Sequence, residues 1–130
     1  MLELLRSPFF VTKVVELALS IICSFLLAGI LPSDTIFQIE VVHTTIFGFV
    51  LVNLVVVLAF FFEEPLSSRL AITISAVATA FHVVAAIIMF GYYLAETNVS
   101  RRILAAAFIT LLDAVIFGAD CFFTCRYIPE

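Results

Sequence analysis

The residues of this chain that could do chemistry are polar side chains set inside strongly apolar segments. One ammonium, three carboxyls, one imidazole and one amide could form ion pairs, hold a proton or bind a cation. Each group is costly in hydrocarbon, so it usually faces the interior of a helix bundle with a partner. The six residues are Lys13, Glu16, Asn53, His82, Asp113 and Asp120.

The spacing of three of these residues predicts a polar layer. Asn53, His82 and Asp113 each fall near the centre of an apolar segment long enough to cross a bilayer. We interpret the layer as interhelical hydrogen bonding that sets helix register, in preference to a proton pathway. A pathway would need polar groups reaching both faces, and stretches 25–30 and 45–50 are almost wholly apolar.

A salt bridge is predicted on one side of that layer. Lys13 lies seven residues before Ser20, the centre of the first segment, and Asp120 lies seven residues after Asp113. Both are therefore roughly 10 Å from the layer, in the same direction, at a rise of about 1.5 Å per residue. Lys13 and Asp120 can meet across antiparallel helices, with Glu16 one turn from Lys13, unless Lys13 instead extends toward the lipid headgroups.

Other chemistries find little support in the sequence. A metal site built from His82, Asp113 and Glu16 is a weak hypothesis, because the membrane segments hold one histidine and no paired ligand spacing. The chain has no nucleophile elbow, metalloprotease motif or phosphate-binding loop. We expect no enzyme activity, no cofactor, no metal and no soluble small-molecule substrate.

The composition places these residues in a membrane protein. Of 130 residues, 65% are hydrophobic and 12% charged, and the mean hydropathy is +1.29. Lipid must cover so much apolar surface. The net charge of −4 comes from few charges near segment boundaries, which excludes nucleic acid as a partner.

The segments predict an all-α fold, an integral membrane antiparallel four-helix bundle with short loops. We expect one domain over residues 1–130, with spans at about 9–31, 44–62, 70–94 and 103–123, the first retained as its own insertion signal. Polar and small residues recur at helical spacing and should face the bundle axis, leaving Phe, Leu, Val and Ile toward lipid. These stripes are Lys13, Glu16, Ser20, Cys23 and Leu27; Ala71, Ser75, Ala78, His82 and Ala85; and Ala106, Thr110, Asp113, Phe117, Asp120 and Thr124.

Positive charge predicts that both termini are cytoplasmic. The basic residues that lie with the termini and the central loop are Arg6, Lys13, Arg69 and Arg126. Arg101 and Arg102 lie on the other side, where residues 32–43 are expected to form a short acidic loop containing Asp34 and Glu40.

Modification sites are the remaining candidates. Cys121 and Cys125, beside Arg126, suit palmitoylation, although packing as small apolar residues is an equal alternative. The three cysteines, Cys23 included, lie within or at the end of apolar segments, which argues against a disulfide framework. Asn98 begins a glycosylation sequon close to two membrane entries, and we expect it to be unused.

Two stretches carry a family resemblance. SPFFVTKVVELALSII, with Lys13 and Glu16, and AAAFITLLDAVIFGADCFF, with Asp113 and Asp120, resemble the four-span MARVEL-like membrane proteins, especially the small insect pasiflora-type proteins of septate junctions. The resemblance covers nearly the whole chain. It implies a non-enzymatic protein that organises membrane in cell junctions or vesicle traffic through lateral contact with lipid, other membrane proteins or further copies of itself.

Two functional hypotheses therefore stand. The first is a component or assembly factor of a cell junction, located in the plasma membrane or in vesicle membranes. The alternative is a proton or cation channel, a transporter or an accessory subunit, using Glu16, His82, Asp113 and Asp120.

Overall fold

The computed structural model describes residues 8–30, 33, 35–62, 67–96 and 98–127. Four helices make up almost all of this part: α2 (Pro8–Leu27), α3 (Ile36–Phe61), α4 (Ser68–Ala95) and α5 (Arg101–Tyr127). The described residues contain no strand. The predicted all-α fold with four long helices and short connections is confirmed.

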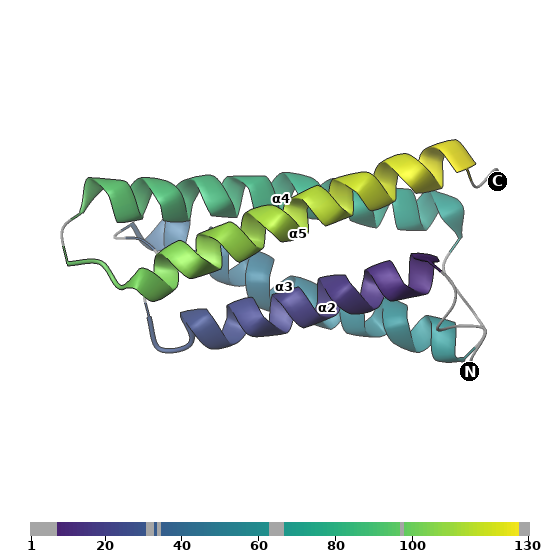
Figure 1. Ribbon diagram of the computed structural model, residues 1–130, viewed down its shortest axis with the longest axis horizontal. Helices are drawn as coiled ribbons and strands as arrows, with labels where there is room; N and C mark the ends of the chain where they lie inside the picture. Colours follow the sequence, from purple (N-terminus) through teal and green to yellow (C-terminus); the bar gives the residue numbers. More distant parts are fainter. Residues whose placement is uncertain (1–7, 31–32, 34, 63–66, 97, 128–130) are drawn as a thin grey trace.

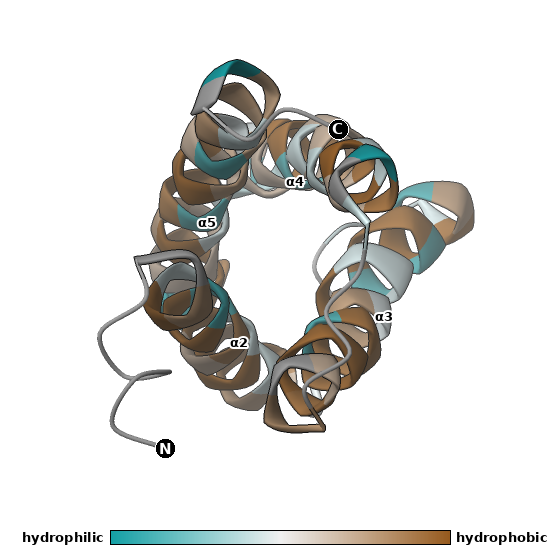
Figure 2. Ribbon diagram, turned by 90° about the vertical axis from the view of Figure 1, so that its right-hand side faces the viewer, coloured by the Kyte–Doolittle hydropathy of each residue, from teal (hydrophilic) through white to brown (hydrophobic). Residues whose placement is uncertain are grey.

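The helices form an antiparallel bundle in which the start of α2 and the end of α5 lie at the same end (Figure 1). Viewed along the bundle, the order around the axis is α2, α5, α4 and α3 (Figure 2). Packing is most extensive between α4 and α5, and least extensive between α3 and α4 among the four neighbouring pairs. The α3–α4 seam is therefore the loosest side of the bundle.

All four helices are long and apolar enough to cross a membrane, over Phe10–Leu27, Ile36–Ala59, Arg69–Ala95 and Arg101–Arg126. Their outward surfaces are dominated by Phe, Leu, Val and Ile, and the helices are mostly brown in Figure 2. Leu51, Ile87 and Val115 are each exposed by more than half. A chain with this exterior is an integral membrane protein, because hydrocarbon must cover that surface.

The first two helices differ from the predicted spans at their loop ends. Helix α2 ends at Leu27, four residues before the end of the predicted span at residue 31. A turn that contains Gly29 at φ 73° follows the helix. Helix α3 begins at Ile36, eight residues before the predicted start at 44. The polar residues Gln38, Glu40 and His43 interrupt the apolar run, yet they lie within this helix. Residues 36–43 of the expected acidic loop are therefore helical, and Asp34 lies outside the described residues.

The ends of α4 and α5 lie closer to prediction and show local capping. The Ser67 hydroxyl accepts a hydrogen bond from the Leu70 amide at 3.3 Å, which supports the first turn of α4. The Ser100 hydroxyl accepts one from the Arg102 amide at 3.2 Å at the start of α5. The Arg102 guanidinium also donates to the Phe25 carbonyl at 2.7 Å and so ties α5 to the end of α2.

The interior divides into two halves along the bundle axis. We call the half next to the start of α2 and the end of α5 the terminal half, and the opposite half the far half. The far half has an apolar core of small and large residues: Cys23, Leu27, Val42, Ile46, Ala85, Met89, Ile103, Ala106 and Ala107. The terminal half and the middle of the bundle hold the buried carboxyl, ammonium and imidazole groups.

Candidate functional site in the bundle interior

The terminal half contains an ion pair between helices. Lys13 of α2 forms a salt bridge with Asp120 of α5, as the helix geometry predicts, and its Nζ lies 3.3 Å from a carboxylate oxygen of Glu16. The Ser75 hydroxyl of α4 donates to Asp120 Oδ2 at 3.1 Å and accepts from Lys13 Nζ at 3.4 Å. Three helices are therefore joined around one ammonium group.

Aromatic rings separate this ion pair from the middle of the bundle. The Phe117 ring lies 5.5 Å from Lys13 Nζ, a cation–π distance, and its centroid is 5.1 Å from that of the His82 ring. The Phe49 ring of α3 lies 5.2 Å from the His82 ring and 6.0 Å from the Phe117 ring, measured between centroids. His82 thus belongs to a cluster of three rings, a contact that residue spacing alone does not indicate.

The middle of the bundle joins α2, α4 and α5 through a second polar group. The Ser20 hydroxyl donates to Asp113 Oδ2 at 3.0 Å. The same carboxylate oxygen lies 3.5 Å from His82 Nε2, which is too far for a well-formed hydrogen bond. The other ring nitrogen, His82 Nδ1, lies 2.7 Å from the Ala78 carbonyl oxygen of its own helix.

The structure brings together His82 and Asp113 of the predicted layer but does not bond Asn53 to them. Asn53 is buried, and both polar atoms of its amide have no hydrogen-bond partner among the described residues. Glu16 Oε1 and Asp113 Oδ1 are in the same situation. Water molecules commonly satisfy such groups in protein interiors.

All six predicted residues are at most 5% exposed. Besides the Cys23 thiol, the buried ionisable groups of the described bundle are three carboxyls (Glu16, Asp113, Asp120), one ammonium (Lys13) and one imidazole (His82). The carboxyls outnumber the ammonium, and an uncompensated charge in a low-dielectric interior is expensive. The arrangement can therefore fix helix positions, and it can also hold additional positive charge.

A polar contact in the far half was not foreseen from the sequence. Cys23 Sγ of α2 lies 3.2 Å from the Thr110 hydroxyl of α5 and 3.6 Å from the Ala106 carbonyl, to which it donates. Cys23 and Thr110 lie on the inward stripes of α2 and α5, which face each other, and this placement could have predicted the contact. Several other hydroxyls instead donate to the carbonyl four residues earlier, namely those of Ser24, Thr45, Thr73 and Thr79.

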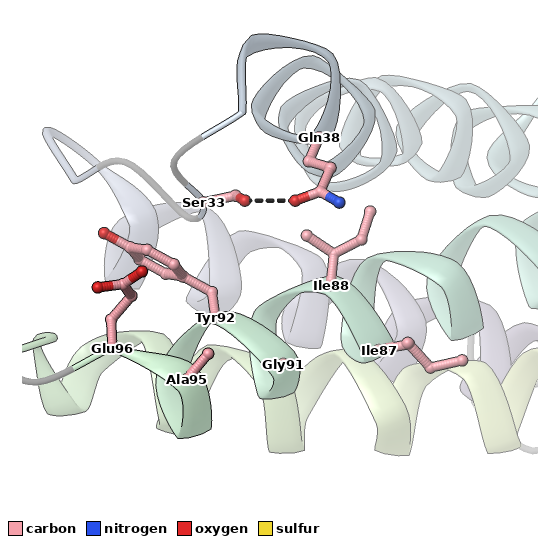
Figure 3. A pocket seen from close by; sticks show the side chains of 8 residues that line it. All are labelled: Ser33, Gln38, Ile87, Ile88, Gly91, Tyr92, Ala95 and Glu96. Atoms are coloured by element: carbon pink, nitrogen blue, oxygen red, sulfur yellow. Dashed lines mark hydrogen bonds between the residues drawn. The ribbon is translucent and has the colours of Figure 1, made fainter.

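A pocket of about 300 Å³ opens at the loose seam between the start of α3 and the end of α4. Figure 3 shows the Ser33 hydroxyl bonded at 2.6 Å to the Gln38 side-chain oxygen on one wall, opposite residues of α4. Its remaining lining residues are Ile87, Ile88, Gly91, Tyr92, Ala95 and Glu96. A Cβ at Gly91 would have no heavy atom within 4 Å, so this helix turn faces open space.

The predicted modification sites differ in exposure. Cys125 is exposed, whereas Cys121 is partly buried and its Sγ donates to the Ile72 carbonyl at 3.8 Å. All three cysteines are free thiols. Asn98 is exposed with φ 65°, and Ser100 of its sequon is engaged in capping α5.

The described residues include no group of three or more His, Cys, Asp or Glu side chains placed to hold a metal ion. Comparison of the chain with models of known protein families, with curated proteins and with solved structures gives no match. The fold and the site therefore define a class, an integral membrane four-helix bundle with a buried polar network. The MARVEL-like resemblance stays a prediction.

Proposed function

We propose that this chain is a non-enzymatic membrane-organising protein, a component or assembly factor of a septate-junction-like cell junction or of vesicle traffic. The observation that carries the proposal is the direction of its side chains. Lys13, Asp113 and Asp120 turn inward and help tie α2, α4 and α5 together, while apolar side chains cover most of the outside. The surface available to partners in the membrane is therefore the lateral, lipid-facing side of the bundle.

The loops support the same proposal. Only residues 28–35, 62–67 and 96–100 connect the four helices. Segments this short offer little surface for a soluble substrate, so association within the membrane plane is the mode of binding that suits the bundle. The MARVEL-like resemblance and the positive-inside rule add the finer proposals, a plasma or vesicle membrane location with cytoplasmic termini.

Proximity labelling in epithelial cells tests this function. A labelling enzyme fused to the chain should mark integral membrane proteins of one junction or vesicle population, and immunolocalisation should place the chain there. The matched control is the same enzyme fused to an unrelated four-span protein. Labelling that is indistinguishable from this control would contradict a specific organising role.

A proton or cation channel, transporter or accessory subunit is the second candidate. It is favoured by the excess of buried carboxyls over ammonium groups, among Glu16, Asp113 and Asp120, and by unpartnered polar atoms beside them. The apolar core of the far half opposes it, because Leu27, Met89 and its other members fill the interior between the polar groups and that end.

Flux in proteoliposomes separates the two candidates. An organising protein should leave the proton permeability of the vesicles at the level of empty liposomes. A pH-dependent leak that is lost in Asp113→Asn, and retained in the surface variant Glu96→Gln, would replace the first proposal with the second.

A further inference from the structure

The hydrogen-bond geometry of His82 determines which nitrogen of its ring carries a proton. A backbone carbonyl oxygen can only accept a hydrogen bond, and His82 Nδ1 lies 2.7 Å from the Ala78 carbonyl. The ring must therefore carry a proton on Nδ1 and donate it to that oxygen. In a neutral imidazole the other nitrogen, Nε2, is then left with a lone pair and can only accept.

That lone pair faces another acceptor. His82 Nε2 lies 3.5 Å from Asp113 Oδ2, and an ionised carboxylate is likewise an acceptor only. Both residues are at most 2% exposed, and Nε2 has no hydrogen-bond partner in the described part of the chain. Two buried acceptors facing each other would repel, whereas one proton between them would turn the repulsion into an attraction.

The charges around the pair also favour one proton between His82 and Asp113. From α2, Lys13 and Glu16 face the interior, and from α5, Asp120 does; Lys13 is already committed to Asp120 and Glu16. The titratable groups of α3, Glu40 and His43, lie in its first eight residues, toward the far end. With Lys13 balancing one carboxylate, the described interior retains two further carboxyls and no second ammonium.

We propose that His82 and Asp113 together bind one proton inside the bundle. The proton resides between His82 Nε2 and Asp113 Oδ2, so that the pair is either imidazolium with carboxylate or imidazole with carboxylic acid. Both forms have no net charge, and Ser20 bonds the carboxyl in each. The bundle is thus a proton-binding protein, and this property does not depend on the proposed organising function, since a held proton need not be conducted.

The test uses the full chain in detergent micelles with nitrogen-15-labelled histidine. The chain has two histidines, so a His43→Gln variant assigns the signals of His82 directly. The expected result is a ring protonated at Nδ1 that shows either an imidazolium signature or, with a neutral ring, an infrared band from a protonated carboxylic acid. Asp113→Asn should abolish that signature, because the asparagine amide can itself donate to Nε2, and should reduce proton uptake by one proton per chain.

Glu16→Gln is the matched control, since it removes a buried carboxyl from the same interior and leaves the pair intact. The signature should survive this variant. A neutral ring without any protonated-acid band in the unmodified chain would overturn the proposal, and so would a band lost in Glu16→Gln alone. A shift of the His82 signals when sodium replaces an organic cation at constant pH would also overturn it, in favour of a bound cation. Because the unmodified chain decides the first outcome, the test stands even if Asp113→Asn does not fold.

Discussion

The terminal half and the far half of the bundle are held together by different means. In the terminal half, Lys13, Ser75 and Asp120 connect three helices through charge and hydrogen bonds. In the far half, the contacts are mainly between apolar side chains such as Leu27 and Met89. Lipid is as apolar as these side chains, so packing alone discriminates weakly between helix arrangements. Polar contacts therefore give this bundle its register, while the complementary shapes of apolar side chains give it close packing.

The largest expected effect follows from removing the ammonium group. Lys13→Leu leaves Asp120 and Glu16 buried without a counter-charge, and we expect a loss of about 3–5 kcal/mol in the free energy of unfolding. Unfolding in mixed detergent micelles measures it. The double variant with Asp120→Leu should recover a large part of the loss, because a buried pair is costly mainly when one partner is missing. Normal stability of the single variant would contradict the ionic role of Lys13.

A smaller effect is expected from the far half. Leu27→Ala removes packing atoms from a fully buried site, and we expect a loss of about 2 kcal/mol, at the lower end of the range for cores in water. The same unfolding assay applies, run in parallel at two pH values. Equal losses at both pH values would support an apolar far half, and a strongly pH-dependent loss would break the contrast between the halves.

The hydroxyl contact in the middle of the bundle should matter less. Ser20→Ala removes the donor to Asp113 Oδ2, and interhelical hydrogen bonds in membranes average roughly 0.6 kcal/mol. Ser24→Ala is the control, since that hydroxyl bonds only within its own helix. Indistinguishable unfolding energies of the two variants would show that Ser20 does not link the helices.

The smallest effect concerns reactivity and leaves stability unchanged. We expect thiol reagents in micelles to modify exposed Cys125 first, partly buried Cys121 later and buried Cys23 only after unfolding. Mass spectrometry over time checks this order. Rapid labelling of Cys23 would mean that the far half opens, and acylation found in cells should follow the same preference for Cys125.

Much of the fold could be predicted, because apolar segments of this length and periodicity can adopt few structures in a membrane other than α-helices. The four helices and the inward stripes need only helical spacing, and the Lys13–Asp120 contact follows from counting residues along antiparallel helices. Helix α3 begins eight residues before the predicted span, since Gln38, Glu40 and His43 lower the local hydropathy without ending the helix.

The details of the site depend on helix rotation and crossing, which residue counting does not supply. Asn53 is not bonded to His82 or Asp113. The α3 residue that packs against His82 is Phe49, and Asn53 lies four residues further along, about one helical turn away. The Phe117 contact with Lys13 and the pocket beside Gly91 also depend on how the helices rotate and cross.

The fold requires that lipid surrounds four apolar helices, with the buried polar network turned inward. Spin labels report this directly when attached through single cysteines at outward positions, in a background where the native cysteines Cys23, Cys121 and Cys125 are replaced. The outward positions, one on each helix, are Ile22, Leu51, Ile87 and Val115. In bilayers, each label should collide often with oxygen and rarely with a water-soluble relaxing agent, whereas a label at Asn98 should show the reverse. Frequent collisions with the water-soluble agent at the four helix positions would contradict the account.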